Sequence, residues 1–257
     1  MIKIIRNFFL TFACILLFSF HPLHAWAKTN RFYYEKKGEV IWEVPTKEKL
    51  VAITFDDGPH PVYTPQILDV LKQYHARATF FLVGTRMTWY PNIVKREVRE
   101  GHELGNHTFT HSFYNKVSHK KFLDELHKTD KLISRYQKKK VKLFRSPGGT
   151  LTKEIINSSK DEGYKVIQWS WHQDPKDWSN PGVKSIVNHV INNVHNGDII
   201  LMHDSGGRRQ QTVEALKEIL PELKKRGYRF ITVSELLEVS PKYKNLFENE
   251  WYHRINL

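Results

Sequence analysis

The fold is decided by a short stretch, VAITFDDGP at residues 51–59, in which an apolar run ends on two adjacent carboxylates. β-Branched and aromatic residues favour strands, so Val51–Phe55 is predicted to be a buried strand. Neighbouring side chains on a strand point to opposite faces, so Asp56 and Asp57 can take two roles only if the chain leaves the strand here. Gly58-Pro59 allows that departure. Taken alone, however, the stretch is typical of an Asp-Asp-Gly turn without chemistry.

From Leu50 onward, short apolar runs alternate with stretches of helical period. This alternation indicates an α/β fold with a parallel sheet and helices packed outside it. Seven or so repeats favour a (β/α) barrel of about seven parallel strands over an open sheet. The predicted strands are Val51–Phe55, Ala78–Val83, Glu103–Asn106, Leu143–Arg145, Lys165–Trp169, Asp198–Met202 and Arg229–Thr232. The predicted helices are Thr64–Tyr74, Pro91–Gly101, Lys120–Gln137, Lys153–Gly163, Val183–Asn196, Gln211–Arg226 and a short last helix, Ser234–Glu238.

The first 27 residues have the pattern of a secretory signal peptide. Lys3 and Arg6 precede the apolar run Asn7–Phe20, and Ala25-Trp26-Ala27 supplies a small-x-small cleavage site. We expect cleavage after Ala27 and therefore a secreted protein, extracellular or associated with the cell wall. The alternative is an uncleaved membrane anchor, for which the apolar run is short.

The remaining chain divides into three segments. Residues 28–48 are polar and aromatic and are interpreted as an N-terminal arm or short hairpin, 49–240 as one α/β domain, and 241–257 as a C-terminal tail. The single cysteine, Cys14, lies within the predicted signal peptide, so the mature chain has no thiol for a disulfide, for catalysis or for a metal.

The full chain is strongly basic, with a formal net charge of +13. It remains strongly basic, with a smaller net charge, after Lys3 and Arg6 are removed. Such a surface favours polyanionic surroundings, and for an exported protein these are anionic cell-wall polymers or membranes. The basic runs Lys138–Lys140 and Lys224–Arg226 are typical of solvated loops and helix ends, so no nucleic-acid partner is expected. The alternative is that the charge serves solubility alone. We expect a monomer.

Four more polar clusters follow predicted strands, at the end where barrels of this kind carry their chemistry. They are His107-Thr-Phe-Thr-His111, Arg145-Ser-Pro-Gly-Gly149, the segment from Trp169 to Trp178, and His203-Asp204. Two histidines four residues apart lie on one side of a helical turn and can share a metal. Five other histidines are assigned to surface or structural roles: His102, His119, His127, His189 and His195.

In this order, the five clusters resemble the motifs of the polysaccharide deacetylase family, also called the NodB-homology domain or carbohydrate esterase family four. The matching segments are TFDDGP at 54–59, His107-Thr-Phe-Thr-His111, Arg145-Ser-Pro-Gly-Gly149, Asp174-Pro-Lys-Asp177-Trp178 and Leu201-Met-His203. The resemblance covers about Leu50 to Leu237, and it implies the distorted barrel of that family.

The resemblance implies a metal held by Asp57, His107 and His111. One carboxylate, two imidazoles and an open position suit catalytic zinc, and the same set would accept cobalt, nickel or iron. A metal in such a site lowers the pKa of bound water to about 7.

The resemblance also implies the catalytic roles. Asp56 would be the general base, and Arg145 would pair with it and keep it ionised. His203 would be the general acid that protonates the departing amine, and Asp177 would orient it, with Asp174 as the second candidate for that role.

Substrate contacts are implied for four further residues: Pro147, Gly148, Trp178 and Leu201. The backbone N–H of Gly148 would face the developing oxyanion, and Trp178 and Leu201 would wall the acetyl pocket. Family members often carry tyrosine where Gly148 stands, so the chemistry is expected to survive while the groove lacks one ring.

The expected reaction is therefore removal of N-acetyl groups, with release of acetate, from a GlcNAc-containing polysaccharide. Export and basic charge favour peptidoglycan over chitin-type oligomers and poly-N-acetylglucosamine. Two alternatives use the same scaffold: an esterase that removes O-acetyl groups, as from xylan, and a non-catalytic wall-binding module. The second predicts damage to the five clusters, and none is visible.

Overall fold

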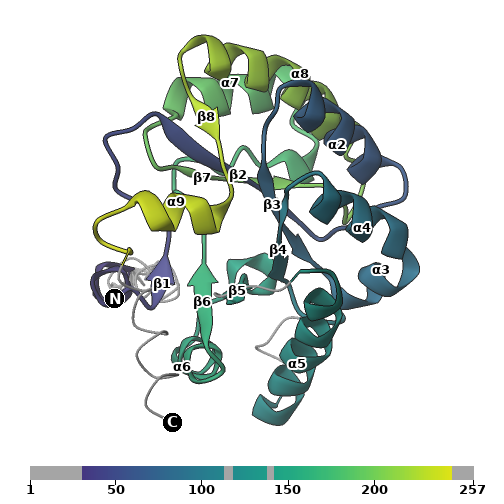
Figure 1. Ribbon diagram of the computed structural model, residues 1–257, viewed down its shortest axis with the longest axis vertical. Helices are drawn as coiled ribbons and strands as arrows, with labels where there is room; N and C mark the ends of the chain where they lie inside the picture. Colours follow the sequence, from purple (N-terminus) through teal and green to yellow (C-terminus); the bar gives the residue numbers. More distant parts are fainter. Residues whose placement is uncertain (1–30, 113–117, 138–141, 245–257) are drawn as a thin grey trace, which may run out of the picture.

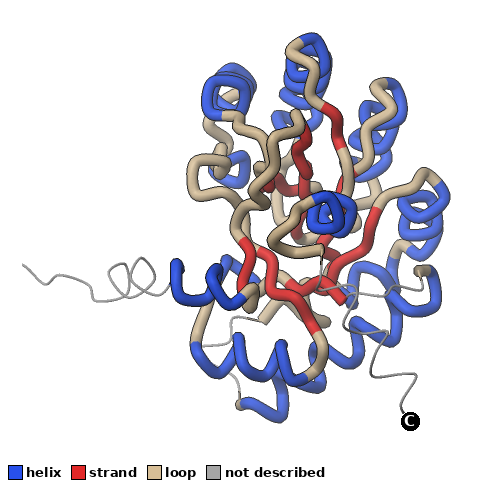
Figure 2. Tube along the Cα trace, turned by 60° about the vertical axis from the view of Figure 1, so that its left-hand side comes forward, coloured by secondary structure: helices blue, strands red, loops and turns tan. Residues whose placement is uncertain are grey.

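The structure is a computed structural model that describes residues 31–112, 118–137 and 142–244. The predicted signal peptide, the basic run Lys138–Lys140 and residues 245–257 of the predicted tail lie outside these ranges. Strands and helices alternate along the described chain, and the helices lie around the outside of the sheet (Figure 1, Figure 2). The α/β fold predicted from the sequence is confirmed.

The sheet has eight strands in the order β1-β6-β5-β4-β3-β2-β7, with β8 paired to β2, and every pair is parallel. The strands are β1 (Val40–Ile41), β2 (Leu50–Asp56), β3 (Ala78–Leu82), β4 (Glu103–Asn106), β5 (Lys142–Phe144), β6 (Tyr164–Ile167), β7 (Ile199–His203) and β8 (Arg229–Phe230). One strand more than predicted is present because the expected arm is not a hairpin. Its residues 31–37 are helical, and β1 then pairs with β6.

The helices pack their apolar faces against the outer side of the strands. They are α2 (Tyr63–Gln73), α3 (Gly84–Trp89), α4 (Pro91–Arg99), α5 (His119–Tyr136), α6 (Lys153–Asp161), α7 (Val183–Asn193), α8 (Gln210–Lys225) and α9 (Val233–Val239), with short 3-10 turns η2 (Pro147–Gly149) and η3 (Asp177–Ser179). Among the described helical elements, α3, η2, η3 and the helix at residues 31–37 were not predicted from the sequence. Thr152 caps α6 by accepting a hydrogen bond from the N–H of Ile155 at 3.1 Å.

The barrel is distorted where β7 approaches β6 and β1. Within the described ranges no strand ladder joins β7 to either of them. Instead, single contacts bridge the gap: the N–H of Ser170 donates to the carbonyl of Ile199 at 3.0 Å, and Glu43 forms an isolated antiparallel bridge with Asp198. The segment that follows β6 therefore lies beside β7 and is held there.

The two faces of β2 explain where polar groups gather. Its outward residues Val51, Ile53 and Phe55 pack in the large core beneath the outer helices. Its inward face begins with the apolar Leu50 and Ala52 and ends with the polar Thr54 and Asp56. The barrel interior is therefore apolar near the start of β2 and polar at its carboxyl end, which faces the βα loops.

The start of the predicted tail belongs to the core. Residues 241–244 form a turn, and Tyr243 is buried in the same apolar cluster as Leu236 and Leu237 of α9. Among the described residues, no helix combines the length and apolar composition that a membrane span requires.

Candidate active site

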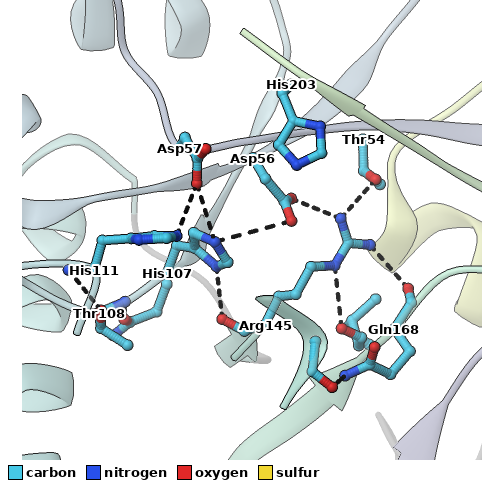
Figure 3. A network of polar contacts seen from close by, with 12 residues as sticks. Thr54, Asp56, Asp57, His107, Thr108, His111, Arg145, Gln168 and His203 are labelled. Carbon is cyan, nitrogen blue, oxygen red and sulfur yellow. Dashed lines mark hydrogen bonds and ion pairs between the residues drawn. The ribbon is translucent and has the colours of Figure 1, made fainter. Parts of the chain in front are cut away.

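The end of β2 separates two neighbouring carboxylates. Asp56 still belongs to the strand, and its side chain is 6 % exposed inside the barrel. At Asp57 the backbone turns into the left-handed region, with φ 75°, so its side chain can point elsewhere. Asp57 reaches the histidine loop after β4, whereas Asp56 reaches Arg145 (Figure 3).

The histidine pair lies in a loop after β4, so the helical turn predicted for it is wrong. Thr108 and His111 both have positive φ, 70° and 59°. Side chains hold this shape: Asn106 accepts a hydrogen bond from the N–H of Thr108 at 2.8 Å, and Thr108 Oγ1 accepts one from the N–H of His111 at 3.1 Å. The loop still brings both rings together, with centroids 5.1 Å apart.

Three ligand atoms converge on one point. Asp57 Oδ1 lies 3.0 Å from His111 Nε2 and 3.5 Å from His107 Nε2. His107 Nδ1 lies 2.7 Å from the carbonyl oxygen of Arg145, which can only accept, so Nδ1 carries the proton and the Nε2 lone pair faces Asp57. Such a backbone contact fixes the orientation of metal-binding histidines.

The charge at this point also suits a cation. Burial by itself would raise the pKa of Asp57, but the neighbouring His107 and His111 rings hold it well below its usual range. The Asp57, His107 and His111 ligand atoms lie within 4.8 Å of one another. One ionised carboxylate and two imidazoles fit a metal of the zinc class.

Asp56 is fixed by a fully buried arginine. Arg145 Nη1 donates to Asp56 Oδ1 at 2.7 Å and to Thr54 Oγ1 at 2.8 Å. Its Nε and Nη2 donate to the carbonyls of Ile167 and Gln168 at 3.2 and 2.8 Å. Burial lowers the pKa of Arg145 and the charge of Asp56 opposes that effect. The second oxygen of Asp56 lies 3.9 Å from His107 Nε2, so the pair borders the ligand cluster.

A partly buried acid–imidazole pair completes the mouth. His203 is the register partner of Asp56 across β2 and β7. Its Nδ1 lies 2.8 Å from Asp177 Oδ1, and its backbone N–H donates to Asp177 Oδ2 at 2.9 Å. Burial alone would lower the pKa of His203, but Asp177, with Asp56 and Asp57 adding smaller effects, raises it to about 9. His203 is therefore a cation at neutral pH, able to donate a proton.

The comparisons with known proteins agree with this geometry. The family model for polysaccharide deacetylase matches residues 43–167. A peptidoglycan-N-acetylglucosamine deacetylase of Bacillus cereus is 54 % identical over 203 residues, which cover 79 % of this chain and 95 % of that protein. The chain belongs to the polysaccharide deacetylase family. It is accordingly a hydrolase of the N-deacetylase type.

Two crystal structures show how far this family fold extends. A peptidoglycan N-acetylglucosamine deacetylase bound to an N-hydroxybenzamide has a TM-score of 0.76 and 36 % identity, covering 81 % of this chain and 97 % of that one. A carbohydrate esterase family 4 pseudoenzyme of Bacillus anthracis has a TM-score of 0.69 and 30 % identity, covering 77 % of this chain and 68 % of that one. The fold of the polysaccharide deacetylase family thus occurs with and without activity, so function has to be argued from the site.

Four residues of this polysaccharide deacetylase were predicted to contact substrate. They lie around the same mouth and differ in how exposed they are to solvent. Gly148 is exposed at η2, where its φ is 61°, and Pro147 beside it is buried. Trp178, on η3 next to Asp177, is 51 % exposed. Leu201 is 3 % exposed and lies two residues before His203, on the same face of β7. Of the four, Gly148 and Trp178 offer surface to a polymer.

Asp174, the second candidate partner for His203, has a different task. Its Oδ1 accepts a hydrogen bond from the N–H of Lys176 at 3.0 Å and shapes the turn before η3. Asp177 holds His203 and in turn accepts a hydrogen bond from Thr212 at 2.7 Å. Thr212 lies on α8, 35 residues further along the chain, and no sequence pattern links it to the site.

Asp204 was not predicted as a site residue, although it directly follows His203. It is fully buried and accepts a hydrogen bond from Thr64. Burial, with Asp57 nearby, raises its pKa to about 7. Its carboxyl group lies where a side chain at Gly58 would stand, since a Cβ there would come within 2.3 Å of Asp204 Oδ2. Glycine in the first motif therefore allows β7 to approach the Asp57 turn.

Proposed function

We propose that this chain is a secreted, divalent-metal-dependent hydrolase that removes the N-acetyl group from N-acetylglucosamine residues of peptidoglycan and releases acetate. The observation that carries the proposal is the junction of three groups at one barrel mouth. The Asp57, His107 and His111 cluster, the Asp56–Arg145 pair and the His203–Asp177 pair meet there.

An acetamide resists hydrolysis because its carbonyl is a weak electrophile and its amine a poor leaving group. The reaction needs an activated water, a stabilised oxyanion and a proton for the nitrogen. When bound by Asp57, His107 and His111, a zinc-class metal would supply Lewis acidity for the first two needs. The other groups belong to the chain itself.

Asp56 is the proposed general base. The guanidinium of Arg145 keeps one of its oxygens, Oδ1, occupied, while Oδ2 faces the His107 side of the mouth. Asp56 can therefore stay ionised and take a proton from the attacking water. Arg145 acts as a positioning residue, because its four hydrogen bonds fix it below the mouth and away from solvent.

His203 is the proposed general acid. Asp177 holds its Nδ1, so the ring presents Nε2 as the proton donor to the departing amine. The backbone N–H of Gly148 is the proposed second stabiliser of the oxyanion. The exposed Trp178 is suited to stack against a sugar ring beside the acetyl group.

Peptidoglycan is proposed as the substrate because the Bacillus cereus relative, at 54 % identity, is a peptidoglycan-N-acetylglucosamine deacetylase. The N-terminal pattern of residues 1–27 supports export, and the net charge of +13 supports retention by anionic wall polymers. Zinc is the proposed metal because its preferred donors match the cluster.

Acetate release from three acetylated polymers tests this proposal: purified peptidoglycan, chitooligosaccharides and acetylated xylan. We expect peptidoglycan to be the fastest substrate and its glucosamine residues to gain free amines. Faster release from acetylated xylan would instead support the O-acetyl esterase. A zinc-loaded enzyme that releases no acetate from any of the three would support the non-catalytic reading.

A further inference from the structure

A second cluster of metal-ligand atoms lies away from the candidate active site. His172, His195 and Asp198 place one ligand atom each within 4.8 Å of the others. Asp198 directly precedes β7, whereas His203 ends it. At about 3.3 Å per residue, the strand separates the two groups by about 16 Å. Nothing in the reaction proposed above uses this cluster.

The distances within the cluster match those between the ligands of one ion. His172 Nε2 lies 3.0 Å from His195 Nδ1 and 3.0 Å from an oxygen of Asp198. His195 Nδ1 lies 3.9 Å from Asp198 Oδ2. Tetrahedral ligands about 2.0–2.1 Å from a zinc ion are about 3.3 Å apart. One cation can therefore reach all three side chains after small movements.

Hydrogen bonds alone do not satisfy this arrangement. Both oxygens of Asp198 and Nδ1 of His195 lie 3.0 Å from the same nitrogen, His172 Nε2. A neutral imidazole nitrogen carries at most one proton, and one proton cannot serve three acceptors. If His172 Nε2 is unprotonated, its lone pair faces a carboxylate. A cation between the three groups removes the conflict, because every lone pair then points to positive charge.

The surroundings hold two of the three ligands in place. Asp198 is 2 % exposed, and its Oδ2 accepts hydrogen bonds from the N–H of His195 at 2.7 Å and from Gln173 Nε2 at 3.3 Å. The carbonyl of His172 lies 3.0 Å from His189 Nε2, which fixes the loop backbone. His195 is the exposed side of the cluster, with 71 % of its side chain exposed, so water can reach a further coordination position there.

We propose that His172, His195 and Asp198 form a second divalent-metal site of the zinc class, distinct from the site at Asp57. Two imidazoles and one carboxylate select the same metals as the first site. His172 belongs to the segment that runs from β6 to Asp177, and Asp198 directly precedes β7. A metal here ties the segment that carries Asp177 and Trp178 to the sheet.

Zinc stoichiometry tests this proposal without any assay of activity. The full-length protein and its variants are dialysed against micromolar free zinc, and bound zinc per chain is measured by mass spectrometry. We expect two zinc ions in the wild type, one in His195→Ala and one in His111→Ala. The double variant should bind none. His127→Ala is the matched control, because His127 is an exposed histidine paired with Glu162 outside both clusters, and it should retain two.

One zinc ion in the wild type that His195→Ala leaves in place overturns the proposal, as does a His195→Ala protein that still binds two. His195 is exposed, so its removal is expected to leave the fold intact, which circular dichroism verifies. If that variant fails to fold, the zinc content of His111→Ala decides. One bound zinc ion that is lost when His172→Gln is added supports the second site. No bound zinc in His111→Ala contradicts the proposal. If the first site binds no zinc in any of these proteins, the difference in bound zinc between the wild type and His195→Ala still tests the second site.

Discussion

Arg145 shows how much of the site depends on a single residue. It is a buried cation with hydrogen bonds to one carboxylate, one hydroxyl and two carbonyls, and its guanidinium lies 4.2 Å from the centroid of the Phe81 ring. A lysine could not reproduce these contacts, because they require the planar fork of the guanidinium. Removing one partner of a buried ion pair destabilises a protein by about 3–5 kcal/mol. Arg145 therefore fixes both the barrel interior and the orientation of Asp56.

His203 allows a prediction about pH. Its pKa of about 9 lies above the ordinary 6.5, so the proton it must donate is present at neutral pH and is lost as the pH rises through about 9. We expect kcat/KM to fall on this alkaline side. In Asp177→Asn the stabilising carboxylate is gone while burial still lowers the pKa, so the fall should begin at a pH at least about one unit lower.

The pH profile of kcat/KM for both proteins measures this shift. A merely structural role for Asp177 would reduce the rate by the same factor at every pH. Coincident alkaline limbs in the two profiles would therefore refute the pairing of Asp177 with a general acid.

At the scale of elements, the site is assembled by loops that follow parallel strands. β2 delivers Asp56 and Asp57, β4 leads to the histidine loop, and β7 ends on His203. The 3-10 turn η2 follows β5 and presents Gly148. Each loop keeps its shape through local constraints, of which positive φ values at Asp57, Thr108 and His111 are the clearest.

The turn η2 gives a prediction for stability. Gly149 has φ +65°, and a Cβ there would lie 2.4 Å from the Trp169 ring. Gly163 has φ +78° with nothing within 4 Å, so it is the matched control. We expect Gly163→Ala to lose about 1–2 kcal/mol of unfolding free energy for its backbone alone. Gly149→Ala should lose a further 1–3 kcal/mol or so through the clash.

Denaturant unfolding of the two variants compares these losses. Because the Trp169 ring lies 5.8 Å from the Arg145 guanidinium, Gly149→Ala should also reduce turnover, whereas Gly163→Ala should not. Equal losses of unfolding free energy would show that the Trp169 ring moves aside without a free-energy penalty and that the turn η2 is not tightly packed.

Local patterns in the sequence predict most of these elements. Apolar runs such as Val51–Phe55 mark strands, because burial on both faces demands them, and polar residues after such runs mark the mouth. Short elements are missed, as α3 shows, since six residues carry too little periodicity. The shape of the histidine loop also escapes prediction, because Asn106 and Thr108 set it through side-chain contacts that override the helical spacing.

Long-range contacts are the other limit. His172, His195 and Asp198 meet only because the segment after β6 folds back beside β7, and the residue spacing gives no sign of it. The assignment of His195 to a surface or structural role follows from its sequence context alone, and its position next to His172 and Asp198 favours a ligand. Thr212 could not be predicted as a site residue for the same reason. The apolar face of α8 determines where this helix packs, and the sequence gives no sign of the hydrogen bond between Thr212 and Asp177.

At the scale of the whole molecule, the strongly basic chain predicts how the enzyme is retained. The full chain has a net charge of +13, which falls to +11 once Lys3 and Arg6 are removed, and such a protein should bind anionic cell-wall polymers by electrostatic attraction that salt screens. We expect walls loaded with the protein to release it as the salt concentration rises from about 0.1 to 1 M, where the Debye length falls from about 10 to 3 Å. Walls stripped of their anionic polymers are the control and should retain little at any salt concentration. Release that does not depend on salt would favour the view that the charge serves solubility.

The proposed mechanism requires a metal held by Asp57, His107 and His111 and a proton taken by Asp56. Acetate release from purified peptidoglycan tests both claims in one measurement, made on zinc-loaded wild type, chelator-stripped wild type and zinc-loaded Asp56→Asn. We expect release by the first protein only, restoration of the second by added zinc, and a loss of about 100-fold or more in the third at unchanged zinc content. Full activity in the stripped enzyme, or in Asp56→Asn, would contradict this mechanism.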